Sequence, residues 1–339
     1  MRTLYGLQYL RGAAAIAVVV FHASARAGHP LLIGEAGVDL FFALSGFLMV
    51  AITGAHSRPL AFLADRWRRI APPYWIATSV FLVGALAGLF PRVKLGMWHI
   101  ASSYLFIPSV SPSSGRVQPL LIPGWTLNYE MAFYLAFAAL LLLMSQRSRM
   151  VAMSGLFVAL VAAGRLLHPT NAIGATLTDP IMLEFVAGGW VAMAWKREAA
   201  WPRWVGPIAL ATGLALLVIV GLADTDRMRA LLFGVPTLLL LVGVLGLERS
   251  RPLAARPLPL LFGDASYSIY LWHTLAISLV AKAGERIGLP PLGIFVMALV
   301  GGVLAGLAGY RLIEAPILRF VRDRRARPGI AVPAAAPAL

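Results

Sequence analysis

Apolar segments long enough to cross a membrane recur along the whole chain, and short polar connections separate most of them. A helix needs about 20 predominantly apolar residues to cross a hydrocarbon core of ~30 Å. The pattern contains ten such segments, near residues 8–26, 36–53, 73–90, 125–144, 150–167, 179–195, 205–222, 229–247, 266–282 and 292–312. Because a helix satisfies its own backbone groups in lipid, we predict an all-α, polytopic membrane protein with about ten transmembrane helices.

Two regions depart from this pattern. Prolines interrupt the long connection 91–124, in which we expect a short interfacial helix at Trp98–Ile107. After the last span, residues 319–339 are basic and then rich in proline and alanine without an apolar face, a composition that favours disorder. We therefore expect a membrane-embedded domain over 1–318 and a disordered cytoplasmic tail over 319–339.

The composition supports the membrane assignment. Hydrophobic residues make up 60% of the chain and charged residues 13%, with a mean hydropathy of +0.81, whereas a soluble domain carries about 25% charged residues. The absence of cysteine excludes disulfides, thiol catalysis and cysteine-ligated zinc. The sequence has no zinc-binding pair of histidines at helical spacing and no phosphate-binding glycine loop, so we expect no metal site.

The distribution of basic residues predicts an orientation. The net charge is +15, from 29 Lys and Arg against 14 Asp and Glu. Positive residues concentrate in cytoplasmic loops, and the loops richest in arginine fall on the same side as the N-terminus. We therefore expect both termini in the cytoplasm and a multi-pass protein of the cell inner (cytoplasmic) membrane. Contacts with anionic lipid explain the charge, so we expect no nucleic-acid partner.

The N-terminus permits one other interpretation. A basic start, an apolar run over Gly12–Phe21 and the small residues Ala23–Ala25 resemble a signal peptide with its cleavage site. Cleavage would remove the first span and leave an odd number of spans. We favour a retained span, and N-terminal sequencing of the purified protein would distinguish the two.

The first apolar segment carries two ionisable residues on one helix face. Arg11 and His22 are eleven residues apart, so an α-helix brings their side chains within roughly 20° of each other and about 16 Å apart along its axis. Ionisable groups inside a bilayer are expensive and usually face a partner or a cavity. This pair is our first candidate for chemistry.

The other polar residues of the spans sort by depth once this topology is assumed. An outer layer is expected to hold His22, Asp39, Glu130 and Glu184. An inner layer is expected to hold Arg11, Arg66, Arg68 and Arg69, the last three on a segment that ends at Pro72 and Pro73. Guanidinium groups suit phosphate, and an imidazole beside a carboxylate suits proton transfer. The layers thus predict an anion-binding mouth inside and an acid–base chamber outside.

Each of these residues also has a structural interpretation. The three arginines Arg66, Arg68 and Arg69 match what positive-inside topology alone would produce. An intramembrane histidine such as His22 or His273 is often a hydrogen-bond partner between helices. Asp39 and Glu184 taken singly are more typical of local pairing than of catalysis. The four remaining histidines fall in loops or interfaces, and we assign them no role.

Six segments, in order, resemble the membrane acyltransferase-3 family. They are Arg11-x10-His22, Gly37-Val-Asp-Leu-Phe-Phe-Ala-Leu-Ser-Gly-Phe47, Arg66-Trp-Arg-Arg-Ile-Ala-Pro72 with Tyr74, Trp125-Thr-Leu-Asn-Tyr-Glu130, Ser266-Tyr-Ser-Ile-Tyr-Leu-Trp-His273 and Ile313-Glu-Ala-Pro316. The resemblance extends over roughly residues 5 to 316 and is strongest to the branch that acetylates exopolysaccharides. Two positions depart from the family pattern, because Asp65 stands where a second arginine is frequent and Thr126 replaces a common serine.

The resemblance implies a ten-helix O-acyltransferase that takes acetyl groups from cytoplasmic acetyl-CoA and modifies carbohydrate. It places the family's functional signature on Arg11 and His22. The acceptor would be an exopolysaccharide or its lipid-linked sugar precursor, and polysaccharide-assembly proteins are candidate partners.

Depth and resemblance together give a mechanistic hypothesis. The nucleotide end of acetyl-CoA would bind Arg66, Arg68, Arg69 and Tyr74, with Arg11 along its path, and the pantetheine arm would follow a polar stripe on the first helix. His22 would act as general base, with Glu130 or Asp39 orienting its ring. The residues expected at the acceptor are Trp125, Asn128, Glu184 and His273.

Two rival functions use the same residues differently. A transporter or flippase for a sugar-lipid or anionic substrate would use the polar residues as a translocation path, although no inverted repeat is evident. A noncatalytic subunit of a polysaccharide-assembly machine is the other alternative. Acetylation of an acceptor by the purified protein separates the enzyme from both.

Overall fold

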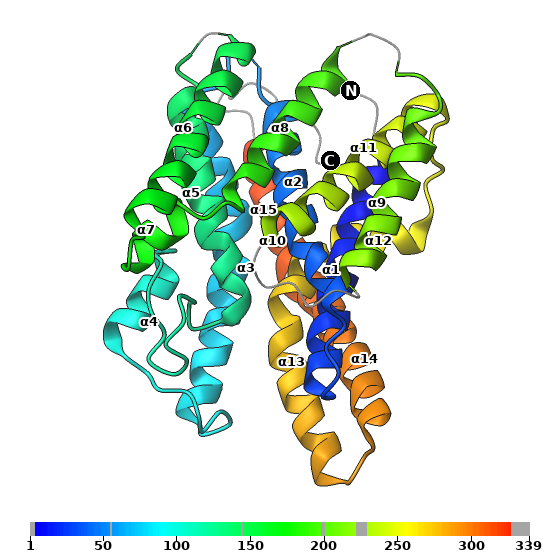
Figure 1. The fold of residues 1–339 in the computed structure, drawn as a ribbon. Coiled ribbons are helices and arrows are strands. Elements are labelled where there is room, and N and C mark those ends of the chain that lie inside the picture. Colours follow the sequence, from blue (N-terminus) through cyan, green and yellow to red (C-terminus); the bar gives the residue numbers. More distant parts are fainter. Residues whose placement is uncertain (1–3, 55, 144, 198–200, 222–228, 327–339) are drawn as a thin grey trace. The chain divides into compact units, whose positions relative to one another are not determined.

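The computed structural model describes residues 4–326 apart from 55, 144, 198–200 and 222–228 (Figure 1). Every regular element in these residues is helical, and one isolated backbone bridge joins Val110 to Val117. The described residues form two compact units, one from residues 53–186 and the other from the described residues before 53 and after 186. The expectation of one membrane-embedded domain over 1–318 stays a prediction. Each unit is described by itself.

The larger unit contains the first two helices and those after residue 186. Its helices are α1 (Tyr5–Arg26), α2 (Ala36–Ile52), α9 (Val205–Gly221), α10 (Arg229–Leu232), α11 (Gly234–Ser250), α12 (Pro257–Asp264), α13 (Ser266–Arg286), α14 (Pro291–Gly309) and α15 (Ala315–Ala326). A 3-10 turn, Leu32–Glu35, precedes α2, and a π-helical turn, Tyr310–Glu314, joins α14 to α15.

The smaller unit contains the helices between residues 53 and 186. They are α3 (Pro59–Leu86), α4 (Met97–Tyr104), α5 (Trp125–Leu140), α6 (Gln146–Leu167) and α7 (Ala172–Leu177). Helix α8 (Met182–Lys196) begins in this unit and continues into the larger one.

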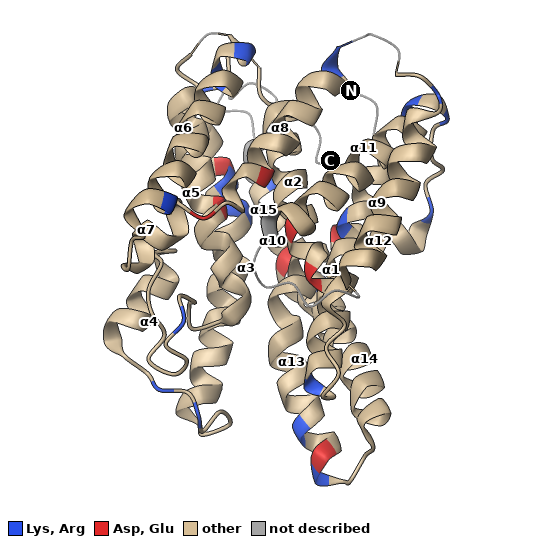
Figure 2. Ribbon diagram, in the orientation of Figure 1, with Lys and Arg blue, Asp and Glu red and all other residues tan. Residues whose placement is uncertain are grey.

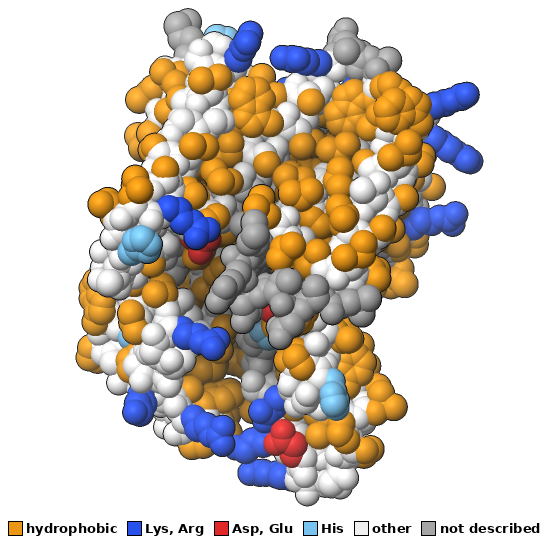
Figure 3. Space-filling model, viewed as in Figure 1, with side chains coloured by type: hydrophobic (Ala, Val, Ile, Leu, Met, Phe, Trp, Pro, Cys, Tyr) orange, Lys and Arg blue, Asp and Glu red, His pale blue; other side chains and the backbone are white. Residues whose placement is uncertain are grey.

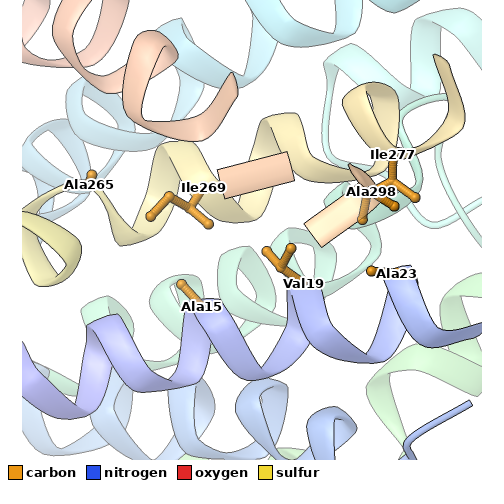
Figure 4. Packing of buried hydrophobic residues seen from close by; sticks show 7 residues of the cluster. All are labelled: Ala15, Val19, Ala23, Ala265, Ile269, Ile277 and Ala298. Carbon is orange, nitrogen blue, oxygen red and sulfur yellow. The ribbon is translucent and has the colours of Figure 1, made fainter. Parts of the chain in front are cut away.

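Helix α1 is the centre of the larger unit, where it packs against α2, α11, α12, α13 and α14. Figure 4 shows its small residues Ala15, Val19 and Ala23 facing α13, with Ala15 opposite Ile269 and Ala23 opposite Ile277. The first three follow one another every four residues and so lie on one helix face. Small side chains let helices approach closely where lipid gives no hydrophobic drive for association. The contacts show that α1 and α13 run parallel.

Glycines bring α2 equally close to α1. A Cβ at Gly37 would overlap the carbonyl oxygen of Ala14, and one at Gly34 would overlap that of Ala17. Residue numbers therefore fall along α1 as they rise along α2, and the two helices are antiparallel. This register determines which residues of α1 and α2 lie at the same height along the helix axes.

The N-terminus of α1 is capped by another helix. The Glu248 carboxylate of α11 accepts hydrogen bonds from the backbone N–H groups of Tyr5 (2.8 Å) and Gly6 (2.9 Å). It satisfies two of the four N–H groups that the start of a helix leaves open, and its negative charge suits the helix dipole. Glu248 thus fixes the helix that carries Arg11 and His22.

We expect Glu248→Ala to lower the free energy of unfolding by about 2 kcal/mol, because two buried donors and the dipole lose their partner. Glu248→Gln keeps an acceptor and should lose about half as much. Thermal unfolding of the purified protein in detergent measures both. Glu285→Ala is the matched control, since it breaks only the exposed ion pair with Arg26 (3.1 Å) and should cost under about 0.5 kcal/mol. Equal melting temperatures for Glu248→Ala and the control would contradict the capping role.

The smaller unit packs around aromatic side chains. Phe133 of α5 stacks on Phe185 at 4.5 Å and also contacts Phe157 of α6. A buried hydroxyl network holds α4 and the loop after it, because Ser109 lies 2.7 Å from Ser102 and 3.2 Å from His99 Nδ1. Burial lowers the pKa of the His99 imidazole. The short helix expected at Trp98–Ile107 is present as α4, and its position at the membrane interface stays a prediction.

Every expected span coincides with a helix, but some boundaries were wrong. Helix α3 runs unbroken through Pro72 and Pro73, where we predicted one segment to end and another to begin. Proline's fixed φ fits a helix, so the pair removes the hydrogen bonds to two carbonyls without ending α3. Helix α15 continues to Ala326, so the expected tail begins as helix, and residues 327–339 lie outside the described part.

The surface of both units is suited to lipid. Four helical segments within the described residues are long and apolar enough to cross a membrane: 5–26, 32–52, 146–167 and 291–323. Helices α9 and α14 carry no charged residue and are uniformly tan in Figure 2. Every fourth residue of α14 is an exposed aliphatic, from Leu292 to Leu304, and hydrophobic side chains cover much of the face in Figure 3. The total of ten spans stays a prediction.

Candidate active site

Two imidazoles meet between α1 and α13. The ring centroids of His22 and His273 are 5.0 Å apart, and the ring planes are inclined by 42°. His22 is half-buried, whereas His273 has no exposed surface. The Nδ1 atom of His273 lies 3.1 Å from the carbonyl oxygen of Ile269, one turn earlier on α13. The structure therefore brings together a residue expected to be the base and one expected at the acceptor.

Arg11 lies in a network of charged residues at the other end of this helix pair. It is 8% exposed, and its Nη1 donates to Oε1 of Gln8 at 3.2 Å. The Tyr310 hydroxyl interacts electrostatically with Arg11, Asp264 and Glu314. Tyr310 is thus the group that interacts both with Arg11 and with the two carboxylates.

The polar stripe expected between Arg11 and His22 is absent. Ala15 and Val18 occupy that face, and their exposed fractions are 0% and 2%. Ala15 packs in the cluster with α13, and Val18 lies against α2 at Gly37. The prediction of a pantetheine path along α1 is therefore wrong, because small residues let the neighbouring helices close over it.

Asp39 does not share a level with His22. Gly37 lies between Ala14 and Val18 of the antiparallel α1, so Asp39, two residues further along α2, is level with about residue 14. That position is about 12 Å along the axis from His22 and closer to Arg11. The expected orientation of the His22 ring by Asp39 is therefore wrong. The cause is the chain reversal after α1, which lays α2 back along it at once.

The smaller unit gathers its own charged cluster. Arg66 of α3 interacts electrostatically with Arg69, Asp65, Glu130 and the Tyr134 hydroxyl. Arg66 is seven residues into the continuous helix α3, about 10 Å from its start. It therefore does not belong to a layer separate from Glu130, and that part of the depth prediction is wrong.

In this cluster Glu130 and Arg68 have polar partners, whereas one nitrogen of Arg66 has none among the described residues. The Tyr134 hydroxyl donates to Oε1 of Glu130 one turn away. Arg68 forms an ion pair with Asp65 at 3.7 Å, with half of the Arg68 side chain exposed. The Nε atom of Arg66 is buried and finds no hydrogen-bond partner within the described part of the chain. Arg66 and Arg69 thus remain the arginines best placed to hold an anion.

Two carboxylates of this unit do share a level, as expected. The Phe133–Phe185 stack and a 3.1 Å hydrogen bond from the Tyr129 hydroxyl to Asp179 show that α5 and the start of α8 run parallel. Glu130 and Glu184 are then within about one helical turn of each other along the axis. Glu184 is 3% exposed.

Other predicted site residues of this unit have mixed positions. Tyr74 is buried, and its hydroxyl donates to the carbonyl of Ser103 at 3.1 Å, so it holds α4 rather than facing a ligand. The expected donor contact of Tyr74 is not supported. Trp125 is half-buried at the start of α5, edge-on to Tyr129, and Asn128 is buried one turn later.

Sequence reasoning missed the contacts of two buried carboxylates. Glu314 accepts from the Ser268 hydroxyl at 2.6 Å beside the π-helical turn, and Glu248 caps α1. Both are 1–3% exposed. The signal in the sequence was the position of each carboxylate next to an apolar span. Burying a charge there costs free energy unless it has a partner. We had quoted Glu314 only as part of a motif and had placed Glu248 just beyond a span.

Comparisons with known proteins define the family. No solved structure shows significant similarity. The chain is 47% identical over 317 residues to the exopolysaccharide production protein ExoZ of Rhizobium meliloti (strain 1021), covering 92% of this chain and 98% of that protein. It is 25% identical over 354 residues to the O-acetyltransferase OatA of Staphylococcus aureus (strain NCTC 8325 / PS 47), covering 93% of this chain but 57% of that protein.

A family model matches most of the chain, well beyond the six short segments quoted above. The acyltransferase-3 model, described as an acyltransferase domain, matches residues 4–311, which include every site residue discussed above except Glu314. Among the described residues no group of three or more His, Asp or Glu could hold a metal ion. The resemblance seen in six segments is confirmed: the chain belongs to the acyltransferase-3 family and is an acyl-transferring membrane enzyme.

Proposed function

We propose that the protein transfers an acetyl group from cytoplasmic acetyl-CoA to a hydroxyl of an exopolysaccharide or of its lipid-linked sugar precursor, at the inner membrane. The names of two relatives support this, since one is an exopolysaccharide production protein and the other an O-acetyltransferase. The observation that carries the proposal is the half-buried His22 beside the buried His273. An imidazole in such a place is suited to moving a proton.

In the proposed reaction His22 removes the proton of the acceptor hydroxyl. The hydroxyl oxygen then bonds to the thioester carbonyl carbon, and the carbon–sulfur bond breaks. The thiolate of CoA takes the proton from the His22 imidazolium, which restores the neutral ring. The products are an O-acetyl ester and free CoA, so atoms and charge balance without a further reactant.

The donor's phosphates would bind Arg66 and Arg69. These two arginines are three residues apart on one face of α3 and repel each other in the absence of an anion. The buried Nε of Arg66 has an open donor position for a phosphate oxygen. We leave Arg68 out of this contact because Asp65 already pairs with it.

Arg66→Ala should raise the KM for acetyl-CoA about 10- to 100-fold, the effect of losing one or two charge-assisted hydrogen bonds, with a smaller change in kcat. Steady-state kinetics in proteoliposomes measure this effect. Arg68→Ala is the matched control on the same helix and should change KM less than about twofold. If the two variants had the same KM, the donor assignment to Arg66 would be wrong.

Transfer by the purified protein tests the proposed function. Proteoliposomes would receive acetyl-CoA labelled in the acetyl group together with polysaccharide or lipid-linked precursor from a non-acetylating strain. We expect the label to appear as an alkali-labile ester on the carbohydrate. Movement of the sugar-lipid across the bilayer without consumption of acetyl-CoA would overturn the proposal in favour of a flippase.

A further inference from the structure

His273 has a defined proton arrangement. Its Nδ1 lies 3.1 Å from the Ile269 carbonyl oxygen, which can only accept, so Nδ1 carries the hydrogen. In the neutral ring Nε2 then has a free lone pair. This Nε2 is buried and has no hydrogen-bond partner among the residues that the structure describes. An unsatisfied buried acceptor is costly and rare in a native structure, and therefore requires an explanation.

The surroundings of His273 point to His22 as the group that this lone pair serves. The two rings are in contact at 5.0 Å, and His22 is the more exposed of the two. On its other sides His273 meets the Tyr270 ring at 5.8 Å and the α14 backbone at Gly302. The χ2 angle of histidine rotates within a broad energy well. A modest turn of the His22 ring can therefore direct an N–H toward Nε2.

We propose that His273 is the positioning residue for His22: its Nε2 accepts a hydrogen bond from one ring nitrogen of His22 while the other removes the acceptor's proton. This inference rests on the proposed function and deepens it. His273 thereby takes the role that we had predicted for Glu130 or Asp39. The level of Asp39 on α2 is too far from His22 for that role. A neutral imidazole replaces the carboxylate that orients the base in serine hydrolases. The hydrogen bond from His22 to the Nε2 of His273 stabilises the ring most when His22 becomes a positively charged imidazolium.

Two substitutions separate this role from packing. His273→Leu keeps an apolar side chain in the space but removes the acceptor, whereas His273→Gln places an amide oxygen near the position of Nε2. We expect His273→Leu to lower kcat about 100-fold with KM for donor and acceptor changed less than about twofold. His273→Gln should recover at least about tenfold of that loss. Ser278→Ala, which removes an exposed hydroxyl from the same helix, should leave both constants unchanged.

A double-mutant cycle gives a second readout. If His273 acts through His22, adding His273→Leu to His22→Ala should cause no further loss of activity. Wild-type kcat in His273→Leu, equal defects in the Leu and Gln variants, or additive losses in the cycle would each overturn the inference. If His273→Leu does not fold, the Gln variant and its cycle with His22→Ala carry the test. Absence of acetyl transfer by the wild-type protein would instead refute the proposed function itself.

Discussion

His22→Ala is expected to reduce acetyl transfer by about 1000-fold, within the range for loss of a general base. The residue is half-buried near the end of α1, so removing its ring should disturb packing little. His22→Gln should be equally impaired, because an amide cannot take up the proton at neutral pH. Initial rates in proteoliposomes, normalised to folded protein from size-exclusion profiles, measure the effect.

The control for this variant is His29→Ala, which changes another histidine just after the same helix. His29 is exposed, and we assign it no role, so its replacement should leave the transfer rate unchanged. A His22→Ala protein that keeps more than about a tenth of the wild-type rate would contradict the role of general base.

Gly37→Ala is expected to lower the free energy of unfolding by about 3 kcal/mol, more than the loss expected for Glu248→Ala. The added Cβ would overlap the Ala14 carbonyl oxygen, which is backbone and can move only if α1 and α2 separate. Since α1 carries both Arg11 and His22, transfer should fall together with stability. Thermal unfolding in detergent and the transfer rate at a low temperature measure the two effects.

Gly155→Ala is the matched control for that substitution. Gly155 also lies within a helix, α6, but a Cβ there meets nothing within 4 Å. Alanine favours helix more than glycine does, so the melting temperature should stay the same or rise slightly. Equal melting temperatures for Gly37→Ala and Gly155→Ala would show that the close approach of α1 and α2 does not limit stability.

The helices could be predicted from sequence because their signal is local. An apolar run of spanning length satisfies its backbone groups as a helix whichever neighbours it has, and each of the ten expected runs coincides largely with helix in the described residues. Boundaries at prolines were less predictable. Proline does not always end a helix, and whether it does depends on the packing around it. Helix α3 continues through both Pro72 and Pro73.

The candidate site was predictable in its residues but not in its arrangement. Arg11 and His22 stood out because ionisable groups are rare in spans. Their shared face suggested a path for the donor, yet Ala15 and Val18 close that face against neighbouring helices. Helical spacing gives direction around one helix, whereas accessibility depends on which helices pack against it.

The contact between His22 and His273 illustrates the same limit. The two residues are far apart in sequence, and nothing in either segment indicates that α1 and α13 run parallel in contact. The level of Asp39 likewise followed from the glycines that set the α1–α2 register, not from its position near the start of a span. Long-range packing therefore decided which polar groups can act together.

The proposed role of His22 in O-acetylation of a polysaccharide is tested most directly on the polysaccharide itself. Mass spectrometry would compare polymer from a deletion strain complemented with the wild-type chain or with His22→Ala at equal membrane abundance. We predict O-acetyl groups on the first polymer, none on the second, and the same sugar backbone in both. Equal acetylation of the two polymers would contradict this role.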